Sequence, residues 1–238
     1  MRDQAPRLRF QQREQGAFYR EVRASAAAYL TGRNAGPHAP AQVWIKFALL
    51  AAWSAGCYAA MLADALPAWL RLAAYAGFGV GAILLAVNVG HEAAHGALSR
   101  LAWVNTLVNR LSFMLVGVDG RMWSKRHLGS HHVYPNILGC DADIDASYLL
   151  RLSPHHPHRT YQRWQHFYAP LIYPLVQVHS IFVQDVVYLF KRRLANLTGL
   201  RPTGLQILEF AAIKAGRTMV TNAPIVSLTV NGSLRLAP

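Results

Sequence analysis

The chain has 238 residues, of which 53% are hydrophobic and only 15% are charged. Soluble domains carry about 25% charged residues, so this composition argues against a water-soluble globule and favours an integral membrane protein. The formal net charge of +13 indicates an anionic partner, and for so apolar a chain we expect membrane lipid rather than nucleic acid. The two cysteines, Cys57 and Cys140, are too few for a disulfide framework.

The first predicted unit is a basic arm, residues 1–42. Its first 33 residues hold seven arginines against three acidic residues, so it is too long and too charged to be the start of a secretory signal. Lys and Arg next to a membrane span are retained in the cytoplasm. We therefore expect the N-terminus to be cytoplasmic.

Two uncharged stretches follow, residues 47–63 and 72–90. As helices they reach roughly 26–29 Å, close to the ~30 Å hydrocarbon thickness of a bilayer. We predict spans over about residues 43–65 and 70–90, joined by a tight turn at Pro67, so that both outer ends lie in the cytoplasm. The expected fold class is all-α, an integral membrane protein with a transmembrane hairpin and a cytoplasmic cap; the alternative is two buried helices of a soluble protein.

Two later stretches are apolar but interrupted by polar residues. Residues 103–118 contain two asparagines and an arginine, which favours a helix lying in the membrane interface over a third span. Residues 167–190 are long enough to cross the bilayer, yet they contain polar and charged residues and run into a basic cluster. We expect this second stretch to be membrane-associated or re-entrant.

The second predicted span ends in His91-Glu92-Ala93-Ala94-His95. Positions i and i+4 of a helix share one face, so the two imidazoles can converge on one metal or on neighbouring metals. Ionisable residues at the end of an apolar membrane helix are costly and usually functional. Two interfacial histidines that only bond to water are the simpler alternative.

A second histidine cluster contains His127, His131 and His132. On an α-helix His131 lies about 40° around the axis from His127, whereas His132 lies about 140° away, so the three can serve two metals more easily than one. A single zinc ion usually takes three protein ligands and a water. Five imidazoles in two clusters therefore suggest a dinuclear centre.

The first cluster also matches the pattern of zinc proteases, in which two histidines at i and i+4 bind zinc and an adjacent glutamate, here Glu92, is the general base. An intramembrane zinc metalloprotease is therefore an alternative. That site needs only one further ligand, and it leaves the second histidine cluster without a role.

The two clusters belong to a longer series of motifs. Val104-Asn105 follows the first cluster and Trp123 precedes the second, and after them come Tyr134-Pro135-Asn136 with spaced aspartates, residues 161–170, and Gln184-Asp185. From about residue 40 to about residue 215 the chain resembles the membrane fatty acid desaturases, in particular bacterial acyl-CoA or acyl-lipid desaturases of the linoleoyl-CoA desaturase type. Residues 43–214 are accordingly expected to be a partial desaturase domain.

The resemblance implies a function and a set of ligands. In that family the histidine boxes hold two non-haem irons, so the implied iron ligands are His91, His95, His127, His131 and His132. The implied reaction introduces a double bond into a fatty-acyl chain, carried by CoA or by a lipid, with O2 and with electrons from a ferredoxin or cytochrome b5 type donor. Hydroxylation uses the same oxidant and stays open. The expected location is the bacterial inner membrane, and the positive charges around the spans place the histidine boxes in the cytoplasm.

Further acidic and histidine residues have two interpretations each. Asp141, Asp143 and Asp145 either orient ligand histidines as hydrogen-bond acceptors or form a solvated acidic turn. The histidines at positions 155, 156 and 158 lie in a proline-rich loop and are expected to be exposed. His166 lies in a family-like stretch and is a weak candidate for the site, whereas His179 is not a candidate.

The family also carries a third histidine box, but no histidine follows His179 in this chain. Residues 215–238 do not resemble the family and are expected to be an atypical tail. Two irons need roughly eight donors, waters included, so five imidazoles leave the shell incomplete. We therefore expect a C-terminally incomplete desaturase that is weak or inactive alone; an inactive remnant is the non-enzymatic alternative.

Overall fold

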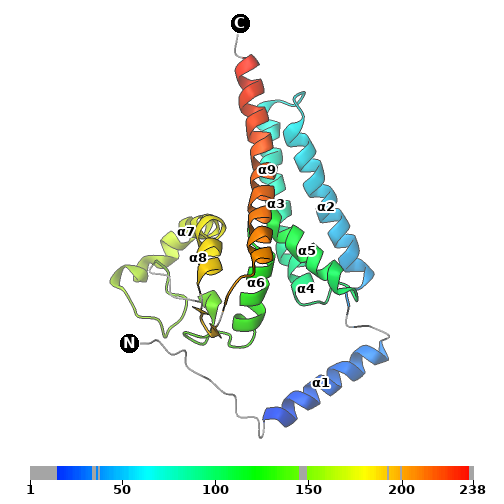
Figure 1. The fold of residues 1–238 in the computed structure, drawn as a ribbon, viewed down its shortest axis with the longest axis vertical. Helices are drawn as coiled ribbons and strands as arrows, with labels where there is room; N and C mark the ends of the chain where they lie inside the picture. Colours follow the sequence, from blue (N-terminus) through cyan, green and yellow to red (C-terminus); the bar gives the residue numbers. More distant parts are fainter. Residues whose placement is uncertain are drawn as a thin grey trace.

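A computed structural model of the chain describes residues 15–33, 36, 38–144, 149–191, 193–198 and 200–235. Across these ranges the chain is almost entirely helical (Figure 1). The β-structure in the described part is a short antiparallel hairpin of β1 (Arg193–Leu194) and β2 (Leu197–Thr198). The predicted helical class is therefore confirmed, apart from this small addition.

The basic arm is only partly covered, because residues 1–14 lie outside the described ranges. Its described part contains helix α1 (Gln15–Gly32), whose residues are almost all exposed. In Figure 1 this helix stands apart from the body of the molecule, beyond the base of the helical hairpin.

The predicted hairpin consists of α2 (Ala41–Leu62) and α3 (Ala68–Leu84). Pro40 and Pro67 directly precede the two helices, where the missing N–H of proline costs no helical hydrogen bond. The helix of α3 continues without a break through a π-helical segment, η1 (Leu85–Gly90), into α4 (His91–Ala94). The chain thus contains two helical stretches that are long and apolar enough to cross a bilayer, Ala41–Leu62 and Ala68–Ala94.

Small residues allow α2 and α3 to approach closely. A Cβ atom added at Gly77 would lie 2.9 Å from the Sγ of Cys57, and one added at Gly81 would overlap the hydroxyl of Ser54. The indole N–H of Trp53 donates to the carbonyl of Gly77 at 2.9 Å. This packing through small residues is typical of membrane helices, which lack a hydrophobic driving force for association.

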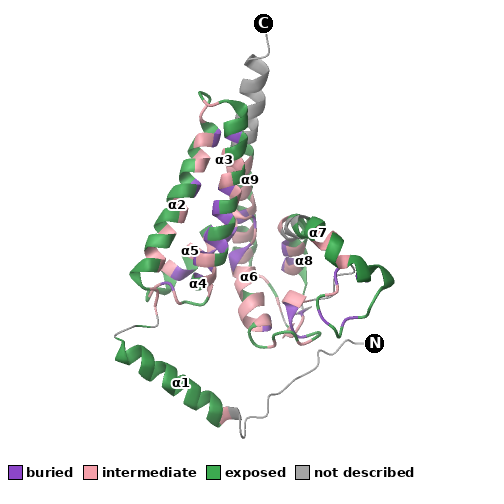
Figure 2. Cartoon of the chain, turned by 180° about the vertical axis from the view of Figure 1, so that it is seen from behind, coloured by how far each residue is buried: buried purple, intermediate pink, exposed green. Residues whose placement is uncertain are grey.

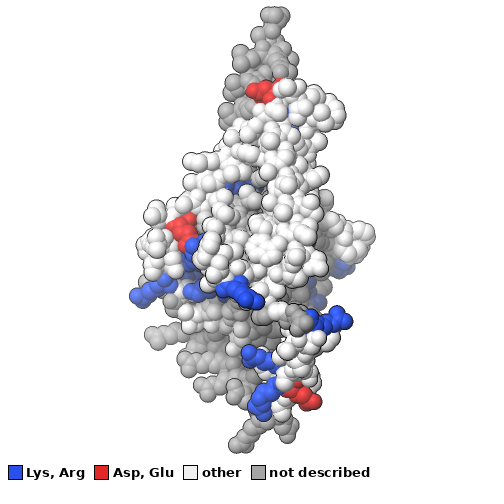
Figure 3. Space-filling model, turned by 90° about the vertical axis from the view of Figure 1, so that its right-hand side faces the viewer, with Lys and Arg blue, Asp and Glu red and all other residues white. Residues whose placement is uncertain are grey.

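The surfaces of α2 and α3 are apolar and exposed. Figure 2 shows both helices largely exposed along their outer faces, and these faces carry large apolar side chains such as Leu49, Trp53, Leu72 and Val80. Figure 3 shows Lys and Arg gathered in the lower part of the molecule, below a column with few charges. Such a surface suits the interior of a bilayer, with the basic end in the headgroup region.

The packed core lies at the base of this hairpin. Leu85, Val89, Ala93 and Leu98 are buried there and pack against the first turns of α2 and against α5 (Ala102–Leu115). Helix α5 crosses the base instead of running along the hairpin (Figure 1). Its buried face carries Asn105, Asn109 and Ser112 together with Phe113, and its exposed face carries Trp103, Leu107 and Leu111, an arrangement consistent with the predicted interfacial helix.

The segments from α6 to α8 together form the cap. They are α6 (Gly120–Arg126), the π-helical η2 (His127–His131), the 3-10 segments η3 (Ala142–Ile144) and η4 (Thr160–Trp164), α7 (Gln165–His179), the π-helical η5 (Ser180–Gln184) and α8 (Asp185–Phe190). The stretch predicted to be membrane-associated is one helical run from α7 through η5 to α8. Its relation to the membrane stays a prediction.

Helix α9 (Gly204–Arg235) returns along the hairpin (Figure 1). It passes through residue 214 without a break, so the predicted boundary between residues 214 and 215 marks the end of the sequence resemblance and not the end of a helix. Residues 236–238 of the predicted tail lie outside the described ranges.

Lys214 fastens α9 to the cap. Its ammonium donates to the carbonyls of Gly117 and Ile181, both at 2.7 Å, and to the Oδ2 of Asp185 at 2.9 Å. The same carboxylate oxygen accepts the backbone N–H of Asp119 at 2.9 Å. One lysine therefore joins α9, α8 and the turn between α5 and α6.

We expect Lys214→Met to lower the free energy of unfolding by about 3 kcal/mol, because it leaves the buried Asp185 carboxylate without its cation. Lys191→Met, on an exposed lysine, should have little effect, and the Asp185→Leu/Lys214→Met double variant should regain much of the loss. Thermal unfolding in detergent measures all three. Equal unfolding temperatures for Lys214→Met and Lys191→Met would contradict a fastening role.

Candidate metal centre

The first histidine pair lies at the end of the long helix, as predicted. The backbone N–H of His95 donates to the carbonyl of His91 at 3.2 Å, and the two ring centroids are 4.7 Å apart. The preceding Gly90 lies so close to α5 that an added Cβ would come within 2.9 Å of the Cβ of Ser112. The side-chain amide of Asn109 donates to the carbonyl of Gly90 at 3.0 Å. Contacts with α5 therefore fix the end of the long helix that carries the two histidines.

The second cluster does not follow the α-helical geometry assumed for it. Residues His127–His131 form a π-helical turn, in which the backbone N–H of His132 donates to the carbonyl of His127 at 2.9 Å. The wider turn aligns i with i+5, and the Nε2 atoms of His127 and His132 are 3.0 Å apart. The expected separation of about 140° between these two histidines was therefore wrong.

The two clusters meet at His127. Its Nε2 lies 3.2 Å from the Nε2 of His91. One nitrogen from each of His91, His95, His127 and His132 lies within 4.8 Å of the others, and a second such group combines His127, His131 and Asp143. The structure thus brings together all five histidines selected from the sequence, as two adjoining groups that share His127.

Two aspartates hold the outer nitrogens of the second cluster. The Nδ1 of His127 lies 3.1 Å from the Oδ2 of Asp143, and the Nδ1 of His131 lies 3.0 Å from the Oδ2 of Asp141. Donation of Nδ1–H to a carboxylate leaves the lone pair on Nε2, which is the usual arrangement of a metal-binding histidine. Asp141 and Asp143 are therefore acceptors, as one interpretation of the sequence held; Asp145 lies outside the described residues.

Asp141 is fully buried and firmly fixed. Its carboxylate accepts the backbone N–H of Asn136 at 2.7 Å and that of Asp143 at 2.9 Å. Burial alone would raise the pKa of Asp141, but these N–H donors and the imidazole of His131 outweigh it, and the pKa is lowered. Asp141 is therefore an anion that can orient His131.

Burial also acts on the imidazoles. It lowers the pKa of His95, with a further contribution from the neighbouring His91 and His132. It lowers the pKa of His127 as well, although Asp143 acts in the opposite direction. Both rings are thus neutral at pH 7, the form that binds a metal.

Aromatic rings hold His127 in place. Trp123, one helical turn earlier, stacks on it with ring centroids 4.3 Å apart and an angle of 21° between the planes. Phe113 from α5 stacks on the other side of the indole, with centroids also 4.3 Å apart. The indole therefore restricts the rotation of the histidine that both groups share.

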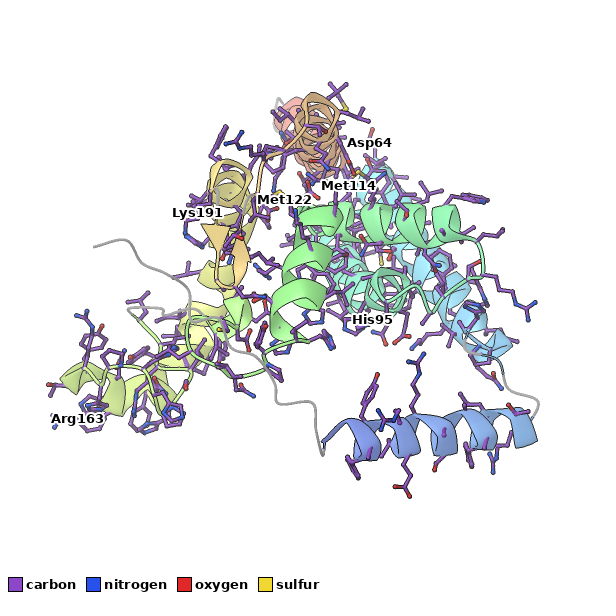
Figure 4. The ribbon with its side chains drawn as sticks, turned by 60° about the horizontal axis from the view of Figure 1, so that its bottom comes forward. Asp64, His95, Met114, Met122, Arg163 and Lys191 are labelled. Atoms are coloured by element: carbon purple, nitrogen blue, oxygen red, sulfur yellow. The ribbon has the colours of Figure 1, made fainter. Side chains whose placement is uncertain are left out.

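Among the described residues, no other histidine belongs to either group. His155 and His158 are exposed as expected, but His156 is 5% exposed and buried in its loop, which corrects the prediction for that residue. His166 is exposed and packs on Phe167, so the weak expectation for it is not supported. Figure 4 shows Arg163, which lies in η4 just before α7, far from His95.

Sequence reasoning missed the residues that support the two boxes. Asn105 bonds both the N–H and the carbonyl of Ser99 behind the first box, and Asn109 bonds Gly90. In the second box the hydroxyl of Ser130 donates to the carbonyl of Cys140 at 2.6 Å and accepts the N–H of Ala142 at 2.9 Å. Asn105 and Asn109 could have been found from the sequence, because two asparagines at i and i+4 in an otherwise apolar helix indicate a shared polar role.

A mostly apolar cavity of about 220 Å³ reaches the site. Its lining includes His91 and Trp123 from the site, and Ile83 and Val87 from the long helix. Arg126, Gln184, Asp185 and Tyr188 supply its polar groups.

The donor set fits a transition metal. Imidazole suits iron, zinc, copper and nickel. The Nε2 of His127 lies 3.2 Å from that of His91 and 3.0 Å from that of His132. A cation between them would accept the Nε2 lone pairs of these rings. Two adjoining groups agree with two metal ions better than with one.

Comparison with known proteins identifies relatives. The chain is 30% identical to an sn-1 linoleoyl-lipid 6-desaturase of Arthrospira platensis over 83% of this chain and 54% of that protein. It is 27% identical to an sn-1 linoleoyl-lipid 6-desaturase of Synechocystis sp., over 76% of this chain and 50% of that protein. The chain thus spans about half the length of these curated relatives. No solved structure matches it.

The family model described as fatty acid desaturase matches residues 67–216. The matched range begins at the start of α3, contains both histidine boxes, and ends two residues after Lys214. The chain therefore belongs to the fatty acid desaturase family.

Proposed function

We propose that the protein introduces a double bond into the acyl chain of a membrane lipid, at a centre of two non-haem irons held by His91, His95, His127, His131 and His132. O2 is the co-substrate, and a ferredoxin or cytochrome b5 type protein supplies the electrons. The named relatives that act on linoleoyl-lipid favour an acyl-lipid over an acyl-CoA substrate.

The observation that carries this proposal is the convergence of the histidines on His127. Four imidazoles from two segments lie within reach of one ion, and the fifth adjoins them through the Asp143 group. The zinc-protease pattern uses only the first box and one more ligand. It explains neither the second group nor the two aspartates behind it, so we favour two irons over one zinc.

The bound irons would supply the oxidant that breaks an unactivated C–H bond, which no side chain can do. The residues of this chain position and protect that chemistry. Asp141 and Asp143 fix the tautomers of His131 and His127, and Trp123 holds the plane of the shared ring. The mostly apolar cavity beside His91 would receive part of the acyl chain.

We also propose an orientation. The histidine groups lie at the basic end of the hairpin, and basic ends of spans face the cytoplasm. The centre would then lie at the cytoplasmic surface of the membrane, in a bacterial cell the inner membrane. An acidic electron carrier could approach this basic side with electrostatic assistance.

Fatty-acid analysis of host cells that express the chain tests the proposal. We expect a new double bond in the acyl chains of membrane lipids, in low yield because five imidazoles fill only part of two iron shells. The matched control is the His127→Ala variant, and cells that express it should contain no new double bond in their acyl chains. A hydroxylated product, or no modified acyl chain from protein that holds iron, would contradict desaturation.

A further inference from the structure

A second, smaller cavity adjoins the one that reaches His91. It lies between α6, α8, the β-hairpin and the start of α9, and its charged lining residues are Arg121, Lys125, Arg126 and Arg201. The two cavities share Met122, Arg126 and Tyr188. The two cavities therefore adjoin, as the headgroup and acyl ends of one elongated molecule would require.

Two of the four cations lack an acidic partner in the described part of the chain. Arg121 lies 3.6 Å from Glu209 and Arg126 lies 3.0 Å from Asp143, whereas no ion pair is formed by Lys125 or Arg201, both of which are exposed. The N-terminus of α9, where Thr203 and Gln206 cap each other, adds positive potential to the same rim. Among the described residues, the cations that line the cavity thus outnumber their acidic partners.

The floor of this cavity is apolar. Leu189 and Leu194 line this cavity and are buried. The cavity therefore combines an apolar base with a basic rim. The neighbouring cavity is apolar on the side of the long helix, where Ile83 is 51% exposed and Val87 is 57% exposed on the outer surface. In a bilayer this side faces lipid, so an acyl chain can enter from the membrane.

We propose that the second cavity binds the phosphate of an anionic membrane phospholipid, with Lys125 and Arg201 as its principal contacts, while an acyl chain of that lipid lies in the cavity beside His91. The inference rests on the proposed function for the acyl half of the site. The basic rim makes these two residues determinants of headgroup preference. The lipid-facing wall favours a phospholipid over the phosphate groups of CoA.

Equilibrium binding to the purified, metal-free chain in neutral detergent tests this assignment. The probes are phosphatidylglycerol, phosphatidylcholine and oleoyl-CoA. Each Lys or Arg near an anionic lipid contributes about 1 kcal/mol, so we expect the Lys125→Gln/Arg201→Gln variant to bind phosphatidylglycerol about 30-fold more weakly. Binding of phosphatidylcholine should change much less, because its choline cation offsets the charge of its phosphate.

The matched control is Arg20→Gln/Arg23→Gln, which removes two charges from exposed positions of α1; it should bind phosphatidylglycerol like the unaltered chain. The charge-conserving Lys125→Arg/Arg201→Lys variant should also retain binding, and equal unfolding temperatures exclude misfolding. Equal losses in the two charge-removing variants would overturn the site, since net charge alone would then explain binding. Preferential, variant-sensitive binding of oleoyl-CoA would overturn the phospholipid assignment.

The assay needs neither iron nor turnover. If the chain binds no iron and desaturates nothing, the proposed function fails, but a headgroup preference that depends on Lys125 and Arg201 would still stand. If iron and activity are present and the preference is absent, only this inference fails.

Discussion

Replacing His127 with alanine is expected to remove both irons from the protein and to abolish desaturation. The Nε2 of His127 faces those of His91 and His132, and the same residue belongs to the group with His131 and Asp143. With its Nδ1–H donated to Asp143, His127 can bind one ion through Nε2, and its loss also removes the hydrogen-bond partner of Asp143 beside His131, so both ions should be disturbed. Metal analysis of the purified variant, with the product assay beside it, measures the effect.

The control for this prediction is His166→Ala, an exposed histidine on α7, which should leave the iron content unchanged. His132→Ala provides a graded comparison, because it removes a ligand from only one group and should lower the iron content less. Circular dichroism should report the same helix content for all three. Retention of one tightly bound iron by His127→Ala would show that the two groups are independent.

Asp141→Asn is expected to have the next largest effect, a decrease in iron affinity of about 10- to 100-fold. The substitution keeps the size of the side chain but removes the anion that orients His131. It also places an amide where the carboxylate accepts the N–H groups of Asn136 and Asp143, and in this fully buried position one of these bonds must be lost. Competition of the variant with an iron chelator measures the affinity.

Asp143→Asn is the informative comparison. The side chain of Asp143 is 25% exposed and also pairs with Arg126, so water can replace part of what the substitution removes, and we expect a smaller loss than for Asp141→Asn. The reverse order would contradict the assignment of Asp141 as the more important acceptor.

The helical hairpin and the histidines that cluster at its base could be predicted because their signals are local in the sequence. Two uncharged stretches separated by a turn at Pro67 indicate α2 and the long helix from Ala68 to Ala94. The i, i+4 spacing of His91 and His95 depends only on α-helical periodicity, which α4 follows. All five histidines chosen from the sequence were brought together.

The relative arrangement of the second cluster could not be predicted from α-helical periodicity. The chain is π-helical at η1, just before the first box, and again at η2, within the second. A π-turn changes which residues share a face, so His132 instead of His131 joins His91. Nothing in the local pattern of residues 127–132 distinguishes the two kinds of turn.

The contacts of Lys214 and of other supporting residues could not be predicted from local patterns, because they join segments that are far apart in the chain. Lys214 binds groups 29 to 97 residues away, and its role depends on the path of α9. The burial of His156 likewise depends on how its loop packs. Local composition, here a proline-rich stretch, indicated exposure and was misleading for that residue.

The central claim is that two adjoining histidine groups hold two irons. Metal analysis of the purified chain by mass spectrometry, after growth with both iron and zinc, tests it most directly. We predict two irons per chain and little zinc. One zinc per chain together with peptidase activity, or no bound metal at all, would contradict the claim.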